Sequence, residues 1–338
     1  MNVEVVKPGL LTTLQDAGRA GFAHLGIGRA GAFDAPALRI ANALCGNPRD
    51  ACALELTLIG PSLCFRSDAW IAVTGAPMSF RVGGAAMPVW APVRVPAGAT
   101  LELGAIRSGC RGYLAVRGGF DVASVLGSRS TDVNARLGPL GGRPLQAGDS
   151  LPVADDGSSP PATRSRRGHW TLDPRPWFSA DPGEPLRLLP ARHLDLLTER
   201  ARNSLFSETF TVHNNSDRVG VRLGGPTLGW AAPVEMVSEG CVPGLLQLPP
   251  SGQPIAFGPE CPVSGGYPRI GQIAAVDVPR LAQRRPRDAV RFVPCSLDEA
   301  LAALRTRENA LSKLELLIRR RTTTDCGFGR DEAAAAPE

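Results

Sequence analysis

Glycine and proline interrupt this chain throughout and limit the secondary structure that it can form. Its 338 residues include 38 glycines and 31 prolines. Glycine permits tight turns and proline ends helices, so the composition favours short strands joined by turns over a bundle of long helices. Short β-rich runs in the first half fit this pattern, at residues 53–58, 70–73, 92–96, 100–103 and 112–116. We therefore predict a mainly β protein, built as a barrel or sandwich, with a few short helices.

The β-rich sequence divides into two blocks around a polar segment. Residues 155–182 are rich in Asp, Ser, Pro and Arg, which predicts a linker between a first domain, 1–154, and a second, 183–295. A short element recurs, as Gly-Pro-Ser-Leu at 60–63 and Gly-Pro-Thr-Leu at 225–228. Two barrels of one kind would explain the recurrence, and a chance match of four residues is the alternative.

One helix is predicted early in the first block, at residues 33–44. Asp34 is a suitable N-cap, and Pro36 suits a first helical turn. Leu38 and Leu44 fall on one face, and a Gly-Asn-Pro sequence follows the helix and ends it.

A longer helix is predicted at residues 296–321. Ser296 and Glu299 form a capping-box pattern, and leucines follow at helical spacing. We expect this amphipathic helix to pack on the second block, and a helix that docks a partner is the alternative. Residues 322–338 are predicted to be a flexible tail.

Charge and lysine content exclude several function classes. The net charge is +5, which is too small to indicate a nucleic-acid binder. The only lysines are Lys7 and Lys313, so the chain has no P-loop Gly-Lys-Ser/Thr sequence. Neither lysine follows a methionine, which argues against covalently attached biotin. The Gly-x-Gly-x-x-Gly match at 26–31 follows a glycine-rich loop and no strand, so we do not read it as a dinucleotide site.

The positions of cysteine and histidine argue against a metal site. The N-terminal sequence and the longest uncharged run favour a cytoplasmic protein. The eight cysteines form no Cys-x-x-Cys pair, which is typical of buried thiols in a reducing compartment. The four histidines are scattered, so we predict no metal. The N-terminus carries an early acid and no long apolar stretch, and the longest uncharged run, 240–259, holds five prolines. We therefore expect neither a signal peptide nor a membrane contact.

Polar residues embedded in glycine-rich loops are the strongest functional signal. Glycine lets backbone N–H groups approach a ligand, and arginine offers a planar fork for a carboxylate or phosphate. Turn chemistry with local Asp–Arg pairs is the simpler interpretation of any single loop, but several such loops on one protein favour a site for a small anionic or amide substrate. The loops lie at 15–19, 31–34, 127–131, 215–222, 247–254 and 264–268.

These loops carry a family resemblance. The sequence resembles the biotin-dependent carboxyltransferase-like family, which includes the 5-oxoprolinase C subunit (KipA) and allophanate hydrolase subunit 2. The matching stretches run in order from about residue 3 to 294. They include PGLLTTLQDAGR at 8–19, GAFD at 31–34, LGSRST at 126–131, SDR at 216–218, PPSGQP at 249–254 and GGYP at 265–268.

The resemblance implies both a fold and an activity. The implied fold is two linked cyclophilin-like β-barrels. The implied activity is ATP-dependent cleavage of 5-oxoproline to glutamate, as one member of a complex with homologues of the B subunit (KipI-like) and of the A subunit. ATP is expected to be bound with or by the partner subunit. The alternatives are a subunit related to allophanate hydrolase or urea amidolyase, and a non-enzymatic regulator that binds the B subunit.

Residue type and motif position suggest roles within such a site. Asp34 or Glu239 could serve as acid or base, and Arg19, Arg129 or Arg218 could hold a carboxylate or phosphate. We assign Asp34, Arg218 and Glu239 as candidate catalytic residues. The candidate substrate-binding residues are Asp16, Arg19, Ser128, Arg129, Thr131, Gln247, Gln253 and Tyr267.

Two motifs depart from the family pattern. Ala30 stands where the family commonly has serine, and Pro262 lies in a segment that loses an amide and a hydroxyl. Both departures predict a changed substrate or reduced activity.

Overall fold

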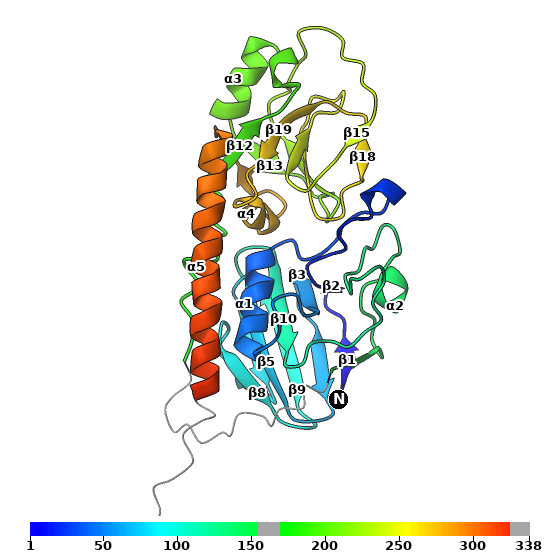
Figure 1. The fold of residues 1–338 in the computed structure, drawn as a ribbon, viewed down its shortest axis with the longest axis vertical. Helices are drawn as coiled ribbons and strands as arrows, with labels where there is room; N and C mark the ends of the chain where they lie inside the picture. The colour runs from blue at the N-terminus through cyan, green and yellow to red at the C-terminus, as the bar shows by residue number, and fades with distance from the viewer. Residues whose placement is uncertain (155–169, 325–338) are drawn as a thin grey trace, which may run out of the picture.

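The computed structural model describes residues 1–154 and 170–324, without the side chains of residues 323 and 324. Two β-rich blocks lie end to end, and one long helix runs along the side of both (Figure 1). Most of the predicted linker, 155–169, and the tail from 325 onward lie outside the described residues. The prediction of a mainly β protein with few helices and a C-terminal helix is confirmed.

The first block consists of two antiparallel sheets around one apolar core. Val3, Leu54, Phe65, Val73 and Leu114 are among the fully buried core residues. The first sheet has the order β11-β1-β4-β9-β6-β7, formed by Ser150–Pro152, Asn2–Lys7, Ser62–Phe65, Thr100–Ile106, Met78–Val82 and Ala85–Ala86. The second has the order β2-β3-β10-β5-β8, formed by Leu11–Gln15, Ala53–Thr57, Arg111–Val116, Ala69–Gly75 and Pro92–Val95. The five predicted strand runs all fall on observed strands of this block.

The second block is an eight-stranded sheet that curves into a nearly closed barrel. Its order is β20-β13-β14-β17-β16-β19-β12-β21, formed by Ala289–Val290, Phe210–Val212, Gly220–Gly224, Ile255–Phe257, Leu245–Gln247, Arg269–Ile273, Leu186–Pro190 and Phe292–Pro294. Only the β12–β21 pair is parallel among the strands described. A separate two-stranded ribbon pairs β15, Glu239–Gly240, with β18, Ser264–Gly265. The recurring Gly-Pro element begins β4 in the first block but forms a loop after β14 in the second.

Helix α1, Ala35–Cys45, lies where the sequence predicted it. Asp34 is its N-cap and accepts a 3.2 Å hydrogen bond from the Ala37 N–H. Gly46 ends the helix in the left-handed conformation, at φ 76°. The helix packs on the face of the sheet that carries β5 and β10, away from the main core.

The positions of three shorter α-helices and two short 3-10 helices were not predicted. The α-helices are α2 (Pro139–Gly142), α3 (Glu199–Ser207) and α4 (Val278–Ala282), and the 3-10 helices are η1 (Ala23–Leu25) and η2 (Leu194–Leu196). Most have one or two turns, so the sequence offers too few residues to show a helical period. Among these elements, α4 matters most for the candidate site because it lies where the two blocks meet (Figure 1).

The long helix α5, Leu297–Thr324, begins at the predicted capping box. The Ser296 N–H donates to Glu299 at 2.8 Å, and the Glu299 N–H donates to Ser296 Oγ at 3.3 Å. The helix packs on the second block, as expected, but it also packs on the first, which was not predicted. Leu311 and Ile318 are buried against α1 of the first block, whereas Ala300 is buried with residues of the second. The helix therefore bridges both blocks.

Described residues of the predicted linker also belong to the first block. Trp170, Leu172, Trp177 and Phe178 pack against the α1 side of that block. These apolar side chains therefore anchor the second half of the predicted linker to the first block. Within 1–154 and 170–324, no helix combines the length and the apolar character needed to cross a bilayer.

Candidate functional site

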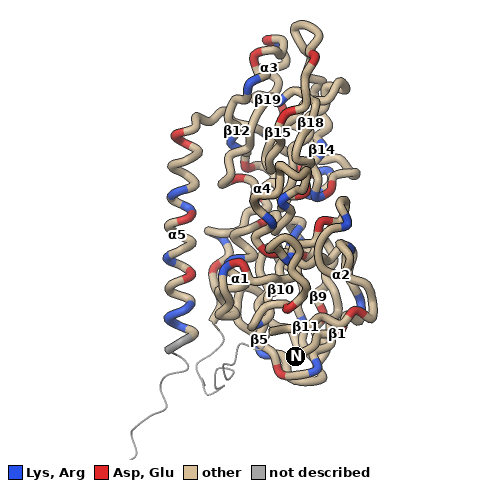
Figure 2. The backbone as a smooth tube through the Cα atoms, turned by 45° about the vertical axis from the view of Figure 1, so that its right-hand side comes forward, with Lys and Arg blue, Asp and Glu red and all other residues tan. Residues whose placement is uncertain are grey.

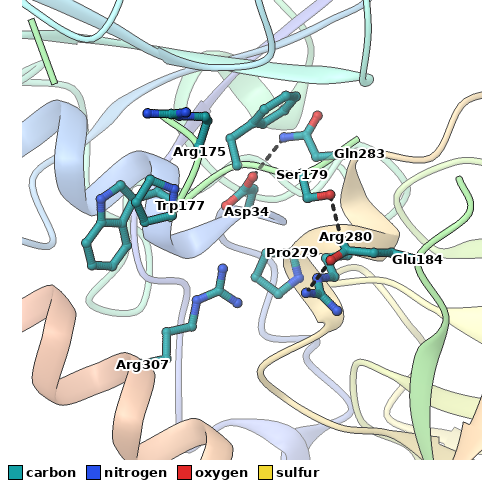
Figure 3. A pocket seen from close by; sticks show the side chains of 11 residues that line it. Asp34, Arg175, Trp177, Ser179, Glu184, Pro279, Arg280, Gln283 and Arg307 are labelled. Carbon is teal, nitrogen blue, oxygen red and sulfur yellow. Dashed lines mark hydrogen bonds and ion pairs between the residues drawn. The ribbon is translucent and has the colours of Figure 1, made fainter. Parts of the chain in front are cut away.

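A small cavity lies where the two blocks, the second half of the linker segment and α5 meet (Figure 3). Its volume is about 90 Å³. Figure 2 shows charged residues of both signs in this region, between α4 and α1. The lining comes from four separate parts of the chain: Asp34, residues 175–179, Glu184, Pro279, Arg280, Gln283 and Arg307.

Asp34 is the buried acid of this cavity. As the N-cap of α1 it accepts the Ala37 N–H with one carboxylate oxygen, and its own N–H donates to the Tyr113 hydroxyl at 2.7 Å. The residue is only 1% exposed. Burial raises the pKa of Asp34 to about 6, against the opposing hydrogen bond from Gln283. A carboxyl group that titrates near neutrality can both accept and donate a proton under working conditions.

Gln283 fixes the second oxygen of Asp34 from the other block. Its side-chain nitrogen donates to Asp34 Oδ2 at 2.7 Å and to the Arg111 carbonyl at 3.1 Å. Its side-chain oxygen accepts from the Cys110 and Arg111 N–H groups at 3.0 and 2.9 Å. All four bonds cross from the segment after α4 to the first block, so they set the position of Asp34 relative to the second block.

The cations of the cavity differ in how they are paired. Arg280 pairs with Glu184 at 3.1 Å and with Asp277 at 3.2 Å. Ser179 donates a 2.7 Å hydrogen bond to the same Glu184. Arg307, from α5, donates to the Val276 carbonyl and has no carboxylate within ion-pair distance among the described residues. Burial lowers the pKa of Arg307, and the negative charge of Asp34 is the largest effect that opposes this lowering.

Arg218, a predicted catalytic residue, forms a buried ion-pair network between the blocks. It contacts Glu55 of β3, donates to Glu260 at 2.5 Å and donates to the Gly31 carbonyl at 2.7 Å. Burial alone would raise the pKa of Glu55, but the charges of Arg218 and Arg111 outweigh it and lower that pKa. With 3% exposure, Arg218 holds the blocks together and does not reach the cavity.

The predicted residues Asp16, Ser128 and Arg129 brace two loops of the first block. Asp16 accepts hydrogen bonds from Ser128 Oγ at 2.6 Å, Ser130 Oγ at 2.5 Å and the Arg129 N–H at 2.6 Å. The Arg129 side chain turns away, to the Val122 carbonyl and Asp121. This cluster therefore fixes loop conformation.

Arg19 and Thr131 are buried beside the same loops. Arg19 donates to the Ser130 carbonyl, and Gln15 donates to the Thr131 carbonyl at 2.9 Å. Two nitrogens of Arg19 and the Thr131 hydroxyl have no hydrogen-bond partner among the described residues. Neither residue lines the cavity.

The remaining predicted residues lie in the second block. Glu239 pairs with Arg192 at 3.3 Å and with Arg269. Gln247 is buried beneath the β15–β18 ribbon, at 3.6 Å from Cys241 Sγ. Tyr267 is 46% exposed on the same side.

Gln253 belongs to a different loop contact. Its side-chain oxygen accepts from the Gly225 N–H at 2.8 Å, and its nitrogen donates to Thr227 at 3.4 Å. The recurring Gly-Pro element of the second block is thus held by a glutamine of the 247–254 loop.

The structure thus places only Asp34 of the predicted residues in the cavity. Sequence reasoning missed its partners Gln283, Arg280, Glu184 and Arg307. Arg307 lies on an amphipathic helix where an arginine is normally solvated, and Gln283 follows a helix of one turn, so neither carried a local signal. Among residues 1–154 and 170–324, no three His, Cys, Asp or Glu side chains gather as metal ligands.

Comparison with known proteins places these observations in a family. Residues 25–294 match the family described as carboxyltransferase domain, subdomain A and B. The 5-oxoprolinase C subunit of Escherichia coli is 38% identical over 92% of this chain and 97% of that protein. The 5-oxoprolinase C subunit of Haemophilus influenzae is 35% identical over 90% of this chain and 95% of that protein.

A solved structure shows the same fold. The Kluyveromyces lactis urea carboxylase superposes with a TM-score of 0.85 at 30% identity, over 92% of this chain and 29% of that one. The chain therefore corresponds to nearly the full length of the bacterial relatives and to one part of the fungal enzyme.

Proposed function

Because this chain belongs to the carboxyltransferase subdomain A and B family, we propose that it is the C subunit of an ATP-dependent 5-oxoprolinase. In this role it cleaves 5-oxoproline to glutamate together with homologues of the A and B subunits. The observation that carries the proposal is the match to two bacterial C subunits along almost their whole length. We further propose that the cavity at Asp34 holds the substrate.

The size of the cavity supports a small substrate. A cavity needs at least roughly 10–15 Å³ of such volume to hold one water, so about 90 Å³ leaves room for one small molecule and not for a large one. 5-Oxoproline, a lactam with one carboxylate, is of this size. ATP is several times larger, which supports a nucleotide site on, or shared with, a partner subunit.

The chemistry of Asp34 suits lactam opening. The lactam carbonyl is a poor electrophile, and ATP supplies a phosphoryl group that turns its oxygen into a leaving group. Water can then add to the ring carbon. Asp34 would accept the proton of that water and return it to the ring nitrogen as the C–N bond breaks. The phosphoryl group would then remain on the new carboxyl group as an acyl phosphate, which a second water would hydrolyse to glutamate and phosphate. Gln283 would hold the carboxylate in place during both transfers.

A reconstitution experiment tests this function. The chain is mixed with its A- and B-subunit homologues, and glutamate release from 5-oxoproline is measured with and without ATP. We expect ATP-dependent release with the wild-type chain and a loss of at least ~100-fold with Asp34→Asn. Arg305→Ala, on an exposed part of α5, is the matched control.

The same mixture separates the alternative functions. The likeness to the fungal urea carboxylase favours a trial with urea, and the sequence resemblance to allophanate hydrolase favours one with allophanate. Turnover of those amides without turnover of 5-oxoproline would place the chain in urea-type metabolism. Tight binding to the B subunit with no turnover of any lactam or amide would support a regulator.

A further inference from the structure

The C-terminal helix completes a cavity whose other walls lie within or near the family domain. The family match ends at residue 294, and α5 begins at Leu297. Yet α5 directs Arg307 into the cavity, on the side facing Asp34 and Pro279 (Figure 3). This arginine is therefore supplied by an element outside the matched region.

Arg307 differs from the other two arginines that line the cavity, Arg175 and Arg280, because no carboxylate of the described residues lies within ion-pair distance of it. Arg280 has two acidic partners, and Arg39 has two on α5 itself, Glu308 at 2.7 Å and Glu315 at 2.9 Å. Glu308, which follows Arg307 in the sequence, therefore already pairs with Arg39. Arg307 uses one nitrogen for the Val276 carbonyl. Its other N–H groups have no partner within the described part of the chain.

A half-buried cation with no carboxylate in direct contact favours an anion in the adjoining space. Guanidinium binds carboxylates through charge-assisted hydrogen bonds, often two at once. The cavity also presents an acid, Asp34, at its other side, which disfavours a dianion such as phosphate filling the whole space. A small molecule with a carboxylate at one end and a neutral amide at the other fits both features.

We propose that Arg307 binds the carboxylate of the substrate, so that the C-terminal helix makes the cavity selective for small amide acids over neutral amides. The proposal rests on the proposed function for the identity of the substrate. It adds that specificity depends on a residue outside the family domain, and that the docking of α5 is linked to substrate binding.

Equilibrium binding to the reconstituted complex without ATP tests this inference. The probes are 5-oxoproline, its carboxylate-free analogue 2-pyrrolidinone, and inorganic phosphate. Arg307→Met keeps the aliphatic stem, Arg307→Lys keeps the charge, and Arg305→Ala is the control on the same helix. Circular dichroism and thermal melts verify that each variant is folded.

We expect the Arg307 substitutions to change the binding of 5-oxoproline and not that of 2-pyrrolidinone. Arg307→Met should weaken 5-oxoproline binding by roughly 10- to 100-fold, as expected for a charged hydrogen bond. Arg307→Lys should recover part of that loss, and 2-pyrrolidinone should bind equally weakly to every protein. Equal 5-oxoproline affinity in folded Arg307→Met and wild type would overturn the inference, as would a wild type that binds phosphate but not 5-oxoproline.

Failure of the inference and failure of the function are distinguishable. Turnover of 5-oxoproline that is unaffected by Arg307→Met refutes the carboxylate contact and leaves the function standing. Arg307-dependent binding of 5-oxoproline without any ATP-dependent turnover refutes the function and leaves the contact standing.

Discussion

The side-chain nitrogen of Gln283 lies 2.7 Å from a carboxylate oxygen of Asp34, and this hydrogen bond joins the second block to the first. Asp34 is also the N-cap of α1, so one carboxylate links the helix, the cavity and the interface between the blocks. A shift of the blocks would therefore change the environment of the candidate catalytic acid directly.

Replacing Gln283 should change the acidity of Asp34. The bond from Gln283 lowers the pKa of Asp34, opposing the larger effect of burial. In Gln283→Met the pKa of Asp34 should rise above its present value of about 6. The acid limb of the pH profile of kcat/KM should move to higher pH. Gln146→Met, at an exposed position of the first block away from the cavity, is the control, and identical profiles for all three proteins would contradict this linkage.

Asp34 should also make stability depend on pH. Its pKa is raised from 3.8 to about 6 in the folded protein, so folding favours the protonated form. This stabilisation is present below about pH 4 and is lost as pH rises through 6, a change on the order of 3 kcal/mol. Urea unfolding of wild type and Asp34→Asn from pH 4 to 7 should show the wild type losing stability relative to the variant. Parallel curves would show that Asp34 is not the titrating group.

The Arg218 network should be structural. Arg218→Met leaves two buried acids, Glu55 and Glu260, without their shared cation, which typically costs about 3–5 kcal/mol. Arg202→Met, which removes an exposed ion pair to Asp195, should change the free energy of unfolding by less than about 1 kcal/mol. Chemical denaturation measures both. A fully stable Arg218→Met protein that has lost only activity would instead assign Arg218 to catalysis.

Much of the fold could be predicted from local sequence. The N-cap at Asp34 and the capping box at Ser296 depend on residues three positions apart, so the sequence alone reveals them. The strands of the first block could also be predicted, because turn residues flank each apolar run. Local patterns therefore identified both major helices and the β-rich blocks.

The candidate site depended on contacts that no local pattern encodes. Asp34 and Gln283 are 249 residues apart, and Arg307 comes from a helix whose contact with the first block was not predicted. Polar residues in glycine-rich loops mostly turned out to brace those loops, as Asp16 does by accepting hydrogen bonds from the Arg129 N–H and Ser130 Oγ of another loop. Only the packing of both blocks and α5 shows which polar residues face a common space.

The packing of α5 on α1 should contribute measurably to stability. Leu311 is fully buried against α1, so Leu311→Ala should cost about 2–5 kcal/mol. Leu317, which is 61% exposed on the same helix, is the matched control, and its replacement by alanine should change stability by less than about 0.5 kcal/mol. Thermal and urea unfolding of both variants give the values. Equal effects of the two substitutions would mean that α5 does not dock as described.

The most direct measurement is a crystal structure of the chain with its A- and B-subunit homologues and bound 5-oxoproline. Our account predicts the lactam ring beside Asp34 and its carboxylate on Arg307, within the cavity bounded by α4 and α5. Density for 5-oxoproline at the β15–β18 ribbon, beside Glu239 and Tyr267, or wholly within a partner subunit would contradict it.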